Sequence, residues 1–345
     1  MDKDLRNDLI VRAGIMYERC QKLIREFMPE KWYQSKLEFE IKDDKEINGR
    51  AWCEGNTDYI EINSGVIETY YNYFLKVMEY FRVITLKMLG YSEEKSECET
   101  MSIETIRFKA DDVYLLDSKV GEKKKTILLE VFVSRFIVLH ELGHIINGHC
   151  KFLKKSSNGT MEFMPMYFNE KMVLSEKEAL DIRTLEMDAD SFAATQAMSH
   201  NIFLYTDFEN QVAIYDIEPK DIFYWWAFAI RSHFLVSEDS HMYNNYSKTM
   251  THLPSVARWT MIYTIAMELI DEYNISEDEK ECFKREIGRG AMSAEEVFNE
   301  IKFSNYSWIN EISATDHFKL YKSEVDDNWE NIKKKLNEYT RLPLW

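Results

Sequence analysis

The most constraining feature of the sequence is an apolar stretch that ends in two histidines placed four residues apart. Residues 126–150 read TILLEVFVSRFIVLHELGHIINGHC, in which the apolar run 132–139 leads directly into His140 and His144. Residues i and i+4 lie on one face of an α-helix, so the two imidazoles can bind a single ion. Polar groups on an apolar helix are costly unless they have partners, so we predict a buried helix with a metal site on one face.

Glu141 follows His140 directly and lies about 100° round the helix from it, beside the ion instead of on it. A carboxylate there can accept a proton from a zinc-bound water, whose pKa zinc lowers to roughly 7, and pass it to a leaving amine. Gly143 costs a helix about 1 kcal/mol relative to Ala, which indicates close approach by substrate or by another helix. The pattern predicts a catalytic zinc ion with Glu141 as general base. Short motifs also recur by chance, so a coincidental match is the competing interpretation.

A second motif, the acidic stretch LEMDADSFAA at residues 185–194, argues against a chance match of HELGH. Glu186 and Asp190 are four residues apart and therefore share one helical face. One of these carboxylates can bind the ion while the other accepts the N–H of a ligating histidine. We predict Glu186 as the third ligand and Asp190 as the residue that orients a histidine, with Asp188 facing solvent. An acidic helix surface is the alternative in a chain with 60 Asp and Glu residues.

His149 is the competing third ligand. In one group of zinc sites, a glycine and a histidine follow the second motif histidine after three and six residues. Those positions hold Asn147 and Cys150 here, while Gly148 and His149 are each displaced by one residue. We therefore expect His149 to lie at the helix end or behind a ligand.

The composition narrows the classes of protein and of partner. The 345 residues include 11 Gly and 5 Pro and are 45% hydrophobic, which is typical of a compact, mainly helical globule. A formal charge of −17 argues against a nucleic-acid partner. The five cysteines form no CxxC pair and favour a reducing compartment. The polar N-terminus resembles no signal peptide, and the apolar runs are shorter than the ~18–20 residues that span a bilayer. We expect a soluble, cytoplasmic protein with no membrane partner.

Hydrophobic periodicity predicts an α+β fold that is mainly α, with a small antiparallel sheet of about three strands. We expect three segments that form one globule: an N-terminal helix, small meander and long helix at 1–125, a catalytic helical core at 126–272, and a helical segment at 273–345. The expected strands are 37–41, 50–53 and 59–62. Expected helices cover 3–28, 65–89, the stretch opened by Ser175 and Glu178, and 255–272, with loops at 91–125 and 154–167. The strand 59–62 is either an edge on which a substrate peptide adds or an internal strand.

The pattern HELGHxxxxH followed by ExxAD resembles the gluzincin metallopeptidases, in the branch of the CAAX-processing and heat-shock membrane peptidases. This resemblance implies zincin-like catalytic helices and Glu186 as the third zinc ligand. The stretch THLPSVAR at residues 251–258 is similar to a later segment of that branch, although Leu253 is an extra residue. The similarity implies that His252 contacts substrate or the oxyanion and that Arg258 braces the site.

Without membrane spans, the layout is more similar to the Lit family of phage-exclusion peptidases. That similarity implies a cytoplasmic protease that cuts elongation factor Tu during phage infection, with an activating phage factor as a further partner. Soluble peptidases that cleave repressors of mobile elements share HExxH and a downstream Glu, and are the alternative. Two other classes stay open: an interaction or sensor protein with a non-catalytic zinc ion, and a hydrolase of small substrates such as dipeptides.

Overall fold

The computed structural model describes residues 3–32, 34–88, 119–156, 164–165, 174–207, 217–237, 248, 251–301 and 311–344. The helices are α1 (Lys3–Phe27), η1 (Pro29–Lys31), α2 (Ser64–Met88), α4 (Lys119–Ile146), α5 (His149–Ser156), α6 (Glu176–Asp207), α8 (Asp221–Val236), α10 (Ser255–Glu272), α11 (Glu277–Glu300) and α12 (Glu311–Leu336). The strands are β1 (Lys36–Lys42), β2 (Gly49–Glu54), β3 (Thr57–Asn63) and β4 (Met164–Pro165). This content confirms an α+β fold that is mainly α.

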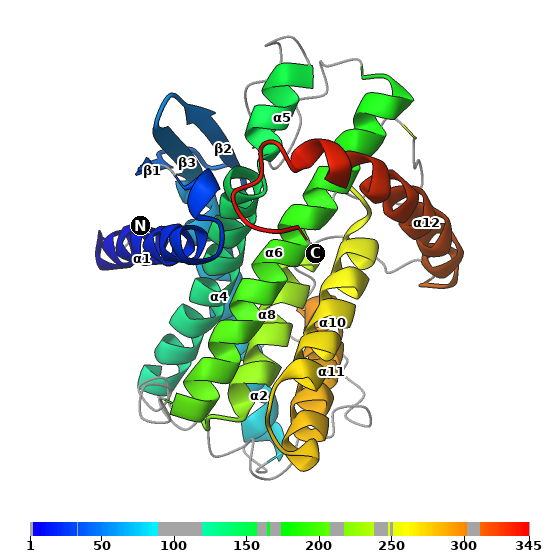
Figure 1. Ribbon diagram of the computed structural model, residues 1–345. Helices are drawn as coiled ribbons and strands as arrows, with labels where there is room; N and C mark the ends of the chain where they lie inside the picture. Colours follow the sequence, from blue (N-terminus) through cyan, green and yellow to red (C-terminus); the bar gives the residue numbers. More distant parts are fainter. Residues whose placement is uncertain are drawn as a thin grey trace.

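Helix α4 is the centre of the bundle, where it packs against α2, α6 and α8, while α10 packs on α6 (Figure 1). The main hydrophobic cluster extends from Leu9 on α1 to Phe298 on α11, so all three expected segments contribute to one core. Within the described parts of the chain, no helix combines the length and apolarity that crossing a bilayer requires. The expected loop at 91–125 lies outside the described residues up to 118, and residues 119–125 instead begin α4.

The small sheet has the order β1-β3-β2-β4, so the predicted antiparallel meander is wrong. Strand β1 pairs with β3 in parallel, from Lys36 opposite Thr57 to Lys42 opposite Asn63, while β2 pairs with β3 antiparallel. The link between β1 and β2 crosses the end of β3, since the carbonyl of Asp44 accepts hydrogen bonds from the Gly65 amide at 2.7 Å and the Ser64 hydroxyl at 3.1 Å. Strand β3 is therefore internal, which confirms the second of the two alternatives for residues 59–62 and excludes the substrate edge.

The segment after α12 joins the end of α4 to the sheet, and Figure 1 shows it returning from α12 across α6. The Arg341 amide donates to the Ile146 carbonyl at 2.8 Å. The Arg341 guanidinium makes two hydrogen bonds of 2.6 Å to the buried carboxylate of Asp58 on β3. The C-terminal segment and strand β3, which are remote in sequence, thus hold the turn that follows His144.

Candidate metal centre

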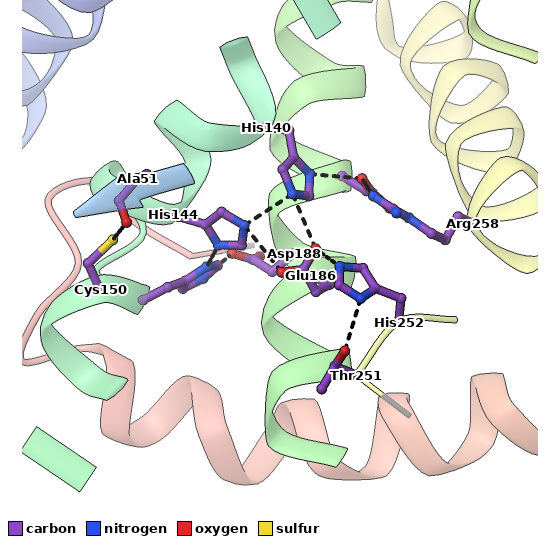
Figure 2. Close-up of polar contacts among 11 residues, drawn as sticks. Ala51, His140, His144, Cys150, Glu186, Asp188, Thr251, His252 and Arg258 are labelled. Atoms are coloured by element: carbon purple, nitrogen blue, oxygen red, sulfur yellow. Dashed lines mark hydrogen bonds and ion pairs between the residues drawn. The ribbon is translucent and has the colours of Figure 1, made fainter. Parts of the chain in front are cut away.

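Three side chains converge where α4 meets α6: His140 and His144 from α4 and Glu186 from α6 (Figure 2). Their candidate ligand atoms all lie within 4.8 Å of one another, and all three side chains are buried. The Nε2 atoms of the two histidines are 3.1 Å apart. Glu186 Oε2 lies 3.2 Å from His140 Nε2, and Glu186 Oε1 lies 3.5 Å from His144 Nε2. This buried group could hold a metal ion.

Small residues let the two helices approach each other. A Cβ atom on Gly143 would lie 3.3 Å from the Cα of Ala189 and from Phe192 Cβ, so the glycine marks close approach by another helix. The N-terminus of α6 is held as predicted: the Ser175 amide donates to Glu178 Oε2 at 2.8 Å, and the Glu178 amide donates to Ser175 Oγ at 3.3 Å. The helix thereby presents Glu186 to α4.

The chemistry of this group fits a divalent cation. Two imidazole nitrogens and a carboxylate oxygen form a ligand set used for zinc and its neighbours. Both Glu186 oxygens are buried and lack a hydrogen-bond partner among the described residues, and two ring nitrogens face each other beside them. A cation between these atoms would satisfy all of them, as buried polar groups require.

The electrostatics of the three residues agree with this fit. Burial lowers the pKa of His140, but contacts with Asp190 and Glu186 outweigh it and raise that pKa to about 10. Burial holds the pKa of His144 well below its ordinary value. Burial favours neutral Glu186, yet the neighbouring His252, His144 and His140 hold its pKa well below the usual range. The same carboxylates that favour a proton on His140 would favour a metal ion in the place of that proton. A histidine binds a metal as neutral imidazole, so the ion would displace the proton.

Asp190 lies behind His140. Its Oδ1 is 2.9 Å from His140 Nδ1, and the Arg258 guanidinium donates to both carboxylate oxygens at 2.7 Å. Burial opposes the charge on Asp190, but Arg258 and His140 hold its pKa below the ordinary value. Arg258 also lies over the ring of Phe234, with 5.1 Å between Cζ and the ring centroid. The carboxylate therefore occupies the position expected of a residue that orients His140.

His149 lies behind His144 at the start of α5. The two Nδ1 atoms are 2.9 Å apart, and His149 Nε2 is 2.9 Å from Asp188 Oδ2. Asp188 also accepts a hydrogen bond of 2.5 Å from the Asn147 side chain. The prediction that Asp188 faces solvent is wrong, because the turn after α4 brings two donors to it. Spacing along α6 alone carries no signal for this contact, and the position of Asn147 gives no reason to predict it as a site residue.

Glu141 is buried next to the ligand group and points toward the sheet. Its Oε1 lies 3.0 Å from the position that a Cβ atom on Gly49, the first residue of β2, would take. Neither carboxylate oxygen has a hydrogen-bond partner among the residues that the structure describes. Burial raises the pKa of this carboxyl to about 8. Such a group is able both to take up and to release a proton near neutral pH.

His252 reaches the same site from the segment before α10. Its Nε2 lies 3.2 Å from Glu186 Oε2, and its Nδ1 lies 3.0 Å from the Thr251 hydroxyl (Figure 2). The extra residue, Leu253, is buried with Ala257 and Val325 in a separate cluster, so it does not displace the histidine. The structure thus brings together the site residues that the sequence predicts.

In comparisons with known proteins, no family model, no curated protein and no solved structure matches this chain. The case for a function therefore rests on the residues of the site.

Proposed function

We propose that this protein is a zinc-dependent endopeptidase whose ion is held by His140, His144 and Glu186. The observation that carries the proposal is Glu141, a buried carboxylate without a hydrogen-bond partner among the described residues, directly beside the ligand group. A buried carboxyl group without a hydrogen-bond partner is costly, and a purely structural zinc site has no use for it. A general base needs this placement and this protonation range.

Each residue has a defined role in peptide hydrolysis. Zinc at such a site supplies an electrophile for the peptide carbonyl and a hydroxide nucleophile at neutral pH. Glu141 accepts the proton of the attacking water on a carboxylate oxygen and returns it to the leaving amine. His252, which lies beside Glu186, donates from Nε2 to the developing oxyanion. Asp190 and Arg258 keep His140 oriented.

For the substrate we propose a cytosolic protein. The resemblance to phage-exclusion peptidases favours elongation factor Tu as target, with cleavage triggered by a phage factor in abortive infection. A repressor of a mobile element is the alternative protein substrate. A non-catalytic zinc sensor is the alternative from another class, and the partnerless carboxylate of Glu141 disfavours it.

The decisive experiment compares the wild type with Glu141→Gln. Both proteins are tested in extracts of cells with and without phage infection. We expect both to bind one equivalent of zinc, and we expect only the wild type to cleave a protein in these extracts. Glu130→Gln is the matched control, because Glu130 is also a buried carboxylate on α4 but contacts Ser134 instead of the site. The control should keep wild-type cleavage.

Two outcomes would contradict the proposal. If wild type and Glu141→Gln both bind zinc and neither cleaves any protein, the chain is not a peptidase. If Glu186→Ala retains full zinc content while His149→Ala loses it, the ligand assignment is wrong. Mapping new N-termini in infected and uninfected extracts distinguishes elongation factor Tu from a repressor.

A further inference from the structure

The two motif histidines are held in different ways on the side away from Glu186. His140 Nδ1 contacts a carboxylate directly, the Asp190 Oδ1 atom at 2.9 Å. His144 Nδ1 instead contacts another histidine, His149 Nδ1, at 2.9 Å. His149 is itself fully buried, so this contact is shielded from solvent.

The hydrogen-bonding capacities of these groups determine where the protons lie. Two ring nitrogens 2.9 Å apart share one proton between them. An ionised Asp188 only accepts hydrogen bonds, so the proton of neutral His149 is on Nε2, which faces Asp188 Oδ2 at 2.9 Å. His149 Nδ1 is then an acceptor, and the shared proton belongs to His144 Nδ1. His144 Nε2 keeps its lone pair and faces Glu186.

We propose that His149 is a positioning residue that, with Asp188, fixes the tautomer and orientation of His144 as a metal ligand. The proposal rests on the metal site proposed above. In this proposal His149 and Asp188 together orient His144, as Asp190 alone orients His140. The geometry also separates His149 from direct ligation, because it contacts the His144 nitrogen opposite the one that faces Glu186.

The backbone explains how His149 reaches this position. Helix α4 ends at Ile146, and Gly148 adopts φ +80°, a conformation that side chains rarely tolerate. This residue turns the chain so that α5 begins with His149 beside the last turn of α4. A Cβ atom on Gly148 would lie 2.5 Å from the backbone of Tyr339, so the C-terminal segment packs directly on the turn. Asn147 in the same turn donates to Asp188 and helps to hold it.

The test is a series of variants at His149, with zinc affinity measured by competition against a chelator. His149→Leu removes the acceptor, and we expect affinity to fall about 10–100-fold, as for other residues that orient ligands. His149→Asn keeps an acceptor oxygen near the place of Nδ1, and we expect it to restore most of the affinity. His200→Leu, a histidine on α6 that is not among the residues of the site, is the matched control and should bind zinc as the wild type does.

Thermal unfolding of the zinc-free proteins separates positioning from packing. The proposal predicts that His149→Leu and His149→Asn unfold at similar temperatures without zinc and differ only when zinc is bound. A cobalt-substituted His149→Leu protein should show an altered visible spectrum, because the His144 ring is free to rotate. If His149→Leu binds zinc as tightly as the wild type, or if Leu and Asn variants are equally weak, the proposal is overturned.

Asp188→Ala alone provides a second route if the His149 variants do not fold, and zinc binding as tight as in the wild type would overturn the proposal. Where the His149 variants fold, double variants extend the test. We expect weaker zinc binding in Asp188→Ala, and no additional loss when it is combined with His149→Asn or His149→Leu, since the two residues act in one chain. Additive losses would overturn the proposal. Zinc-loaded wild type that cleaves nothing refutes the peptidase function but leaves this affinity series decisive, whereas a wild type that binds no zinc refutes both.

Discussion

At the scale of single residues, the site is a set of charges that compensate one another. Asp190 is buried between a histidine and Arg258, and its contacts outweigh the cost of burial. Asp190 touches His140 directly, whereas Arg258 donates to Asp190 and reaches His140 through it. The two residues should therefore differ in their effects on the ion.

We predict that Asp190→Asn weakens zinc affinity about 10–100-fold, as loss of a carboxylate behind a ligating histidine typically does. Arg258→Gln keeps the Asp190 carboxylate against His140 and should lose less. Chelator competition on both purified variants checks this order. A larger loss for Arg258→Gln than for Asp190→Asn would contradict it.

At the scale of the elements, close packing between helices sets where the site residues meet. Helix α8 is buried along nearly its whole length, as a helix that is apolar all round requires, and it packs on α11. A Cβ atom on Gly290 of α11 would lie 2.2 Å from the Tyr224 carbonyl oxygen on α8. Because α8 also packs against α4, this contact supports the helix that carries His140 and His144.

Gly290→Ala should lower the free energy of unfolding by about 1–3 kcal/mol, because the added methyl group overpacks a backbone contact. Gly288 on the same helix is the matched control, since a Cβ atom there meets only the Tyr263 hydroxyl at 3.9 Å. Gly288→Ala should raise stability by up to about 1 kcal/mol through helix propensity. Urea unfolding of both variants tests the pair, and equal effects would contradict the packing argument.

At the scale of the whole molecule, the pair formed by Asp58 and Arg341 joins the sheet to the C-terminal segment. The side chains are 2% and 3% exposed, and the hydroxyl of Tyr17 on α1 also donates to Asp58 at 2.6 Å. Burial would favour the neutral carboxyl, but Arg341 and Tyr17 hold the pKa of Asp58 below its ordinary value. This pair connects three regions around the turn behind His144.

Asp58→Asn should destabilise the fold by about 3–5 kcal/mol at neutral pH, because it leaves Arg341 buried without its partner charge. Glu61→Gln is the control on the same strand, since Glu61 pairs with the more exposed Arg50 and should cost at most about 1 kcal/mol. Urea unfolding at neutral pH measures both. A loss for Asp58→Asn no larger than for the control would be inconsistent with a buried, structural pair.

The same pair predicts a pH dependence. The folded state lowers the pKa of Asp58, so the stabilisation is complete above the unfolded-state pKa of about 3.9 and is lost as pH falls from there through the folded-state value. Stability of the wild type should drop in this acidic range more steeply than that of Asp58→Asn. If the free energy of unfolding falls equally with pH in the wild type and in Asp58→Asn, the assignment is contradicted.

The sequence by itself determined most of the helices and the three candidate ligands of the site. Helix bounds follow from local periodicity and capping, as for Ser175 and Glu178, and the i,i+4 spacing on each of two helices places His140 with His144 and Glu186 with Asp190. These are short-range relations that a linear pattern carries.

Only the tertiary structure decided which strands pair and what lies behind His144. The parallel pairing of β1 with β3 depends on a crossing link that strand periodicity does not specify. Asp188 has a partner because a turn after α4 returns His149 to α6, and Asp58 meets Arg341 across 283 residues. Such contacts depend on how whole elements pack, because the free energy that selects them comes from burial shared among distant segments.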